Sequence, residues 1–181
     1  MPIPPRPSYI ADNICSESMW ASSPLSDRAL FVARSQQKEG VKEIGNNWGP
    51  VVKMYLKVAG IGSPAPWCAA FVTWCLLEAG ANKKKLPKNP ASTYFWWDWS
   101  RKTKRSASGP ARGLLFVWNG KGGGHIGFIV NVTTKHFFTI EGNTNEAGSR
   151  EGTAVMDKTR KTSDLLKYPR WGFIDVSGLD V

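Results

Sequence analysis

The sequence predicts an α+β domain in which N-terminal helices pack against an antiparallel β-sheet built from the later part of the chain. Before residue 80, apolar runs are bounded by residues that start and end helices. After residue 114, short β-branched and aromatic runs alternate with Gly- and Asn-rich turns. Helices followed by strands are typical of α+β domains. A chain of 181 residues with 41% hydrophobic content and nine Trp is long and apolar enough for one such core.

Three helices are expected in the first half of the chain. Ser26 is an N-cap candidate for the first, Pro50 suits the first turn of the second, and Gly80 follows the end of the third. The third has almost no polar side chains, so we expect it to be buried nearly all round. The three expected helices cover residues 26–40, 48–60 and 68–79.

The remaining segments complete the expected domain organisation. Residues 1–25, rich in Pro and Ser, are interpreted as an irregular leader, and residues 26–181 as a single catalytic domain. Residues 83–113 are interpreted as a basic loop that contains one aromatic group, YFWWDW. Four runs are expected to form strands: LLFVWN, HIGFIVNVT, HFFTIEGN and RWGFIDV.

The net charge of +10 is concentrated in three clusters, at residues 83–85, 101–105 and 157–161. A basic surface favours anionic partners such as cell-wall polymers, although each cluster alone is typical of a solvated loop. No apolar run reaches the roughly 20 residues that a bilayer-spanning helix needs, and the amino end has no apolar core of a signal peptide. We therefore expect no membrane span, and delivery by a route other than general secretion if the protein acts outside the cytoplasm.

The three cysteines are Cys15, Cys68 and Cys75, an odd number that argues against a disulfide framework. On one helix, Cys68 and Cys75 would be separated by roughly 10 Å of rise, which is too far for a disulfide. Cys68 stands directly behind a proline and a tryptophan, where the apolar helix begins. The free N–H groups at a helix start favour thiolate over thiol, so Cys68 is a candidate nucleophile.

A thiolate nucleophile needs a base and a group that orients the base. The chain has two histidines, and His125 lies at the start of an apolar strand behind a Gly-rich turn, whereas His136 lies in an expected hairpin turn. Glu141 and Asn143 are two residues apart on a later strand and so are expected to face the same way. Either of them could fix the tautomer of His125.

The motifs WCAAFVTWCLLEAG, GGGHIGFIV and TIEGNTNEAGSREG closely resemble the CHAP family of cysteine- and histidine-dependent amidohydrolases and peptidases, and especially its small peptidoglycan hydrolases. The resemblance covers about residues 40–176. It implies a papain-like fold of the NlpC/CHAP type and hydrolysis of an amide bond in bacterial peptidoglycan. It also matches Cys68 to the nucleophile, His125 to the base, Glu141 to the orienting group and Asn143 to a supporting polar residue.

The resemblance leads to further expectations about ligands. Trp67, Tyr55 and Trp96 are expected to contact the substrate. No acidic calcium loop precedes Cys68, so no metal and no cofactor are expected. Family members usually have a Gly-Asp pair before the histidine strand, where this chain has Gly113 followed by Leu114.

Two other functions compete with hydrolysis. Zinc binding is disfavoured because the Cys and His residues lack C-x-x-C spacing. A non-catalytic, basic and aromatic-rich wall-binding module is the alternative. As an enzyme, the protein is expected to be a monomer that binds no nucleic acid and acts in the periplasm or cell wall of a target cell, as an antibacterial effector or a phage lysin. An effector would need an immunity protein that occludes the Cys68 cleft.

Overall fold

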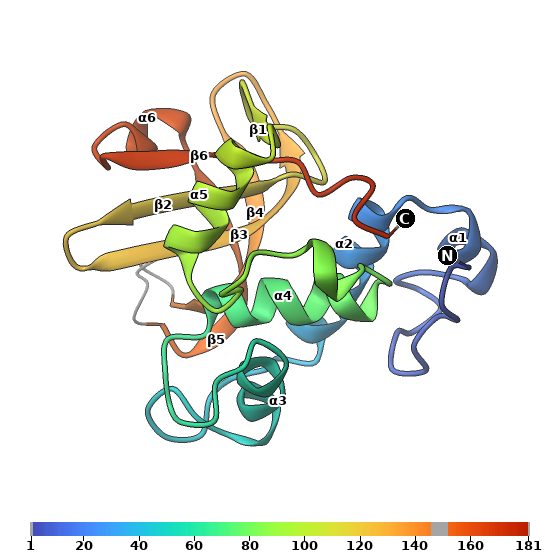
Figure 1. Cartoon of the computed structure of the whole chain (residues 1–181). Coiled ribbons are helices and arrows are strands. Elements are labelled where there is room, and N and C mark those ends of the chain that lie inside the picture. Colours follow the sequence, from blue (N-terminus) through green and yellow to red (C-terminus); the bar gives the residue numbers. More distant parts are fainter. Residues whose placement is uncertain (1, 146–151, 181) are drawn as a thin grey trace.

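A computed structural model describes residues 2–145 and 152–180. Its helices and strands follow the predicted order, with helices first and most of the sheet afterwards (Figure 1). The helical elements are α1 Glu17–Ser22, α2 Leu25–Lys38, α3 Pro50–Val58, α4 Cys68–Glu78, the 3-10 helix η1 Lys83–Lys85, α5 Thr93–Lys102 and α6 Thr162–Leu165. The strands are β1 Ser106–Ala107, β2 Leu115–Gly120, β3 Gly123–Val132, β4 Phe137–Thr144, β5 Ala154–Arg160 and β6 Arg170–Ile174.

The strands form one six-stranded sheet in the order β1-β6-β2-β3-β4-β5, with every neighbouring pair antiparallel. The strands β2, β3, β4 and β5 are neighbours in sequence and in space, so residues on them are brought together by short connections. The predicted α+β architecture is confirmed.

Helix α4 is the centre of the molecule, and it packs against α2, α3, β3 and β4 (Figure 1). Every residue from Cys68 to Leu76 is buried, as its apolar sequence predicts. The alternation along β2 separates two cores: Leu115 and Val117 belong to the large cluster that contains α4, and Phe116 and Trp118 to a smaller one. Helices α2 and α4 therefore cover one face of the sheet.

Two expectations about the N-terminal half need correction. The segment 1–25 is not wholly irregular, because it contains α1, and its Ile10, Cys15 and Trp20 lie in the same hydrophobic cluster as α4. Apolar side chains spaced along a Pro- and Ser-rich segment were enough to bury it against the domain. Helix α2 begins after Pro24 as N-cap rather than Ser26, since the fixed φ of proline also suits a helix start.

The segment 83–113 is more regular than expected. Its aromatic group lies within α5, whose inward face buries Trp96 and Ser100 against the sheet. The sequence there mixes aromatic residues of low helix propensity with charges, and only burial on the sheet favours the helix. Strand β5 was also not predicted, because its second half, residues 157–160, belongs to the basic cluster and Val155 is its one buried residue.

Among the described residues, no helix is long and apolar enough to cross a membrane.

Candidate active site

Cys68 is the first residue of α4, with Trp67 as N-cap. Its side chain is only 4% exposed, but it lines a pocket of about 300 Å³. The pocket walls come from the approach to α4, from the segment before α5 and from the start of β3: Ile61, Ala65, Pro66, Asn89, Ala91, Ser92, Thr93 and Gly124. A thiol at a helix N-terminus that opens into a pocket has the placement of a nucleophile.

His125 lies on β3 and is fully buried. Its Nε2 is 2.8 Å from Oε2 of Glu141 on the neighbouring strand β4. Its other ring nitrogen, Nδ1, is buried and has no hydrogen-bond partner among the described residues. Because Glu141 occupies Nε2, Nδ1 is the nitrogen available to exchange a proton with the thiol of Cys68.

The protonation of His125 depends on these two neighbours. Burial lowers the pKa of His125, but its interactions with Cys68 and Glu141 outweigh burial and raise that pKa to about 9. The imidazole ring is therefore protonated at neutral pH. A protonated His125 places a positive charge beside the thiol of Cys68 and holds a proton that it can give to a leaving group.

Glu141 is held by three side chains. It accepts hydrogen bonds from His125, from Thr139 on its own strand, and from two nitrogens of Arg160 on β5. Burial alone would raise the pKa of Glu141, but Arg160 and His125 together lower it to about 2. Glu141 is thus a buried carboxylate that stays ionised over the physiological range.

A glycine on β3 makes room for this carboxylate. A Cβ atom at Gly127 would lie 2.8 Å from Cγ of Glu141 and 2.8 Å from a ring atom of Phe116. Both distances are too short for ordinary contact, so a larger residue would push Glu141 away from His125. The apolar strand that carries His125 therefore needs a glycine two residues further on.

Asn143 is also buried, but its backbone differs from the regular strand that the sequence predicts. Its φ is +55°, and the pairing of β4 with β5 shifts register between Glu141 and Thr144. Asn tolerates this left-handed conformation better than most residues. The regular alternation of side chains between the two faces of β4 is interrupted at this point. The expectation that Glu141 and Asn143 face the same way assumed a regular strand, which the structure does not have here. The contact with Nε2 of His125 is made by Glu141.

The three residues expected to contact substrate are instead in the core. Tyr55, Trp67 and Trp96 each have 0% exposure. The hydroxyl of Tyr55 donates to Gln36 at 2.6 Å, and Nε1 of Trp96 donates to the carbonyl of Pro90 at 2.9 Å. Large aromatic rings bury more apolar area than other side chains, and this placement uses that area for stability.

Other aromatic side chains of α5 do reach the surface. Tyr94 and Phe95, in its first turn, are 44% and 39% exposed. They directly follow Thr93, which lines the Cys68 pocket. The sequence alone could not separate them from Trp96, because the helix that sorts them was not predicted.

Arg160 is the site residue that the sequence did not reveal. It lay within the basic cluster 157–161, which is typical of a solvated loop. The sequence contained one weak indication that Arg160 belongs to a strand. Two apolar residues, Val155 and Met156, stand directly before the charged run, as at the start of a half-buried strand. Its contact with Glu141 depends on the pairing of β4 with β5, which the sequence does not specify.

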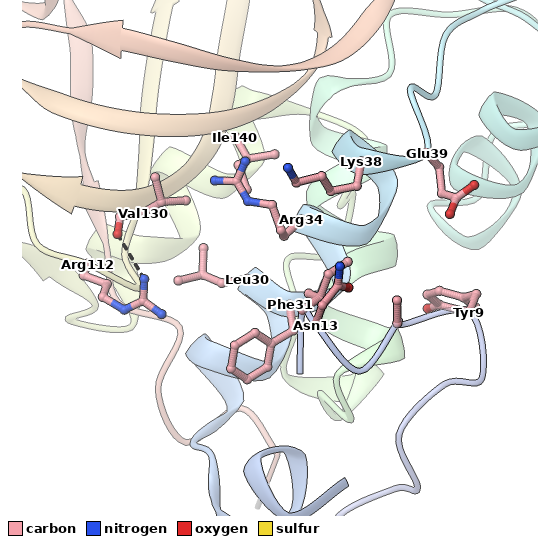
Figure 2. A pocket seen from close by; sticks show the side chains of 12 residues that line it. Tyr9, Asn13, Leu30, Phe31, Arg34, Lys38, Glu39, Arg112, Val130 and Ile140 are labelled. Atoms are coloured by element: carbon pink, nitrogen blue, oxygen red, sulfur yellow. Dashed lines mark hydrogen bonds between the residues drawn. The ribbon is translucent and has the colours of Figure 1, made fainter. Parts of the chain in front are cut away.

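A larger pocket lies elsewhere among the described residues. A pocket of about 590 Å³ lies between the N-terminal segment and α2, where Arg34, Lys38 and Arg112 surround an apolar floor (Figure 2). Arg112 donates to the carbonyl of Val130 at 3.0 Å there. Neither Cys68 nor His125 lines it. We therefore place the active site by its chemistry rather than by cavity size.

No group of three or more His, Cys, Asp or Glu side chains within residues 2–145 and 152–180 is arranged to hold a metal ion. Cys15, Cys68 and Cys75 are all free thiols.

Residues 60–143 match the family model described as the CHAP domain. This segment, a little under half of the chain, is therefore similar to the CHAP domain. The matched segment contains Cys68, His125, Glu141 and Asn143, and the observed fold is the papain-like α+β fold of this family. Arg160 lies outside the matched segment.

Comparison with solved structures gives matches of low sequence identity, and comparison with curated proteins found no match. "The crystal structure of Ly7917" shares 15% sequence identity with a TM-score of 0.49, covering 82% of this chain and 61% of that chain. "The crystal structure of Ly7917 with the hydrolyzing product of MDP" shares 15% identity with a TM-score of 0.44, covering 82% and 62%. The chain therefore spans about three fifths of the length of these structures.

The arrangement of Cys68 and His125 leads us to expect selective alkylation of one thiol. Burial raises the pKa of Cys15, and it raises that of Cys75 well above its ordinary value, so both should be poor nucleophiles. Iodoacetamide at neutral pH should modify Cys68 first, since it opens into a pocket beside a protonated His125. Peptide mass spectrometry over a time course measures this order. Earlier labelling of Cys75 in the folded protein would contradict the assignment.

Proposed function

We propose that this protein is a peptidoglycan hydrolase that cleaves an amide bond with Cys68 as nucleophile and His125 as general base. The observation that supports the proposal most is the position of His125. Its ring lies between the thiol of Cys68 and the ionised carboxylate of Glu141, inside the segment that matches the CHAP domain. Nucleophile, base and orienting group are the three parts that acyl transfer requires.

The proposed reaction has two steps. In the first, Sγ of Cys68 attacks the carbonyl carbon of the substrate amide, and the proton of the resting thiolate–imidazolium pair stays on His125. The C–N bond then breaks, the amine leaves with that proton from Nδ1, and a thioester remains on Cys68. In the second, His125 takes a proton from water and the hydroxide attacks the thioester carbon. The C–S bond then breaks, the carboxylic acid product leaves, and the Cys68 thiolate and the protonated His125 are restored.

The negative oxygen formed in each step needs hydrogen-bond donors. The backbone N–H groups of the first turn of α4 have no partner within the helix, because the first four N–H groups of any helix lack one. The N–H of Cys68 is the donor we assign to this oxyanion. Glu141 acts throughout as a fixed negative charge that keeps the His125 ring in one tautomer and stabilises its protonated form.

Digestion of purified sacculi tests the proposal. We expect the protein to release soluble muropeptides, and mass spectrometry of the products identifies the bond. Free lactyl groups on the sugar together with intact stem peptides indicate an N-acetylmuramoyl-L-alanine amidase, whereas cut stems or cross-bridges indicate an endopeptidase. No release under any condition, with sacculi still bound, would favour the alternative of a non-catalytic wall-binding module.

The biological role that we propose is action on the wall of a target cell, as an antibacterial effector or a phage lysin. The net charge of +10 suits an anionic polymer as partner. If the role is that of an effector, the producer is expected to carry an immunity protein that occludes the Cys68 pocket. Co-expression of the neighbouring gene product and its co-purification with the hydrolase tests that expectation.

A further inference from the structure

Arg160, the last residue of β5, makes a two-pronged contact with Glu141. Its Nε donates to Oε1 and its Nη2 donates to Oε2 of the carboxylate. This paired geometry fixes the plane of a carboxylate as well as its position, which a single hydrogen bond does not. Oε2 is also the atom that His125 contacts at 2.8 Å. One oxygen therefore joins Arg160 to the ring of His125.

Packing holds Arg160 in this position. Its side chain is 17% exposed, whereas the side chain of Glu141 is fully buried. The guanidinium lies over the ring of Phe116, 5.0 Å from the centroid, and the same ring lies 6.0 Å from that of His125. The ring of Phe116 therefore lies next to both the guanidinium of Arg160 and the ring of His125. Its packing under the guanidinium keeps the plane of that group directed toward Glu141.

The charge of Arg160 has a specific consequence in this buried place. A carboxylate that is removed from water takes up a proton unless a nearby positive charge compensates it. Of the groups that lower the pKa of Glu141, Arg160 comes first and His125 second. Among the described residues, the ionisable groups that act on the pair include His125 on β3, with Cys68 on α4 next to it, and Asp164 and Tyr168 next to Arg160.

We infer that Arg160 is a positioning residue of the active site: it holds the Glu141 carboxylate against Nε2 of His125 and supplies the positive charge that balances it. It does not contact the substrate. Its effect on catalysis passes entirely through Glu141 and His125. This inference rests on the proposed function for its catalytic readout, but the contact itself can be tested through the reactivity of the Cys68 thiol.

The first test measures kcat/KM on solubilised muropeptides against pH for Arg160→Gln and Arg160→Lys. Arg160→Gln should lose about tenfold to a hundredfold in activity at neutral pH, as supporting partners of reactive groups usually do. The acidic limb of the pH profile of Arg160→Gln should move up by about one pH unit or more. Without the arginine the pKa of Glu141 rises, and Glu141 is ionised only at pH values above its pKa. Arg160→Lys keeps the charge and should shift the limb less.

A matched control separates this effect from the loss of a surface charge. Nη1 of Arg34 on α2 donates to both carboxylate oxygens of Asp157, which is on the same strand as Arg160, but both partners are partly exposed and neither touches Glu141. Arg34→Gln should leave the pH profile unchanged. A profile of Arg160→Gln that matches the wild type would overturn the inference.

A double variant tests whether Arg160 acts through Glu141. In a Glu141→Gln background, Arg160→Gln should cause no further loss of activity, since the carboxylate that it positions is already gone. Independent losses that multiply would show a separate role and contradict the inference. Arg160→Gln alone leaves the buried carboxylate of Glu141 without its ion-pair partner, which can prevent folding. The double variant removes both charges together, so it can still be measured in that case.

Iodoacetamide labelling gives a readout that needs no substrate. Arg160→Gln should label Cys68 more slowly than the wild type at acidic pH, with a difference that shrinks toward neutral pH. An altered labelling profile in a protein that does not digest sacculi would support the role of Arg160 and refute the proposed function. Unchanged labelling in an active enzyme would refute the role of Arg160 alone.

Discussion

Cys68→Ala is expected to abolish hydrolysis of peptidoglycan while the protein stays folded. The substitution removes one sulfur atom that lines a pocket, so the loss in free energy of unfolding should be within about 1 kcal/mol. Without the nucleophile no thioester forms, and the rate should fall by about a thousandfold or more. Release of soluble fragments from sacculi measures the rate, and thermal unfolding measures stability.

Cys75→Ala is the matched control for this loss. Cys75 lies two turns further along α4 and is completely buried. Its replacement leaves a cavity and should cost about 1–3 kcal/mol, but activity per folded molecule should stay near that of the wild type. Purified Cys68→Ala protein that still digested sacculi would overturn the proposed mechanism, and Cys68→Ala protein that binds them without digestion would support it.

The second large effect is expected at Glu141. Glu141→Gln keeps the shape of the side chain and removes its charge, so turnover should fall by about a hundredfold to ten-thousandfold. Glu141 is one of the two groups that raise the pKa of His125 to about 9. Without it that pKa falls. The imidazolium form is lost as pH rises through the pKa, so the alkaline limb of activity, near pH 9 in the wild type, should move to lower pH.

Asn143→Ala is the comparison for Glu141→Gln. Asn143 is buried within the register shift between Glu141 and Thr144, and its side chain is expected to support the site rather than orient His125. Milder damage with an unchanged alkaline limb is the expected result. If Asn143→Ala were the more damaging, with Glu141→Gln close to wild type, then Asn143 would be the orienting residue.

The parts of this fold that the sequence predicted are those specified by neighbouring residues. Pro50 and Gly60 enclose α3, and the apolar run after Cys68 forms α4 from its first predicted residue. Strands β2, β3, β4 and β6 coincide with the four β-branched and aromatic runs. Each of these elements carries its own start, stop and periodicity.

The parts that were missed depend on contacts between distant residues. Helix α5 is stabilised by burial of Trp96 on the sheet, which propensity alone does not predict. The ion pair of Glu141 with Arg160 joins residues 19 positions apart, and it exists only because β4 and β5 pair in one register. An amphipathic strand that includes a run of charges looks like a loop until its partner strand is known.

Because Cys68 is part of the buried helix α4, the position of the nucleophile depends on the cooperative stability of the whole fold. Segments with few buried contacts open by local fluctuations, whereas fully buried elements exchange their amide protons only when the molecule unfolds globally. From Cys68 to Leu76, α4 has no exposed face through which a local opening could begin. The amide groups of α4 beyond its first turn, from Phe71 onward, should therefore be among the slowest to exchange with deuterium. Heat or denaturant would then inactivate the enzyme at the same midpoint at which it unfolds, with no earlier loss of the reactive group.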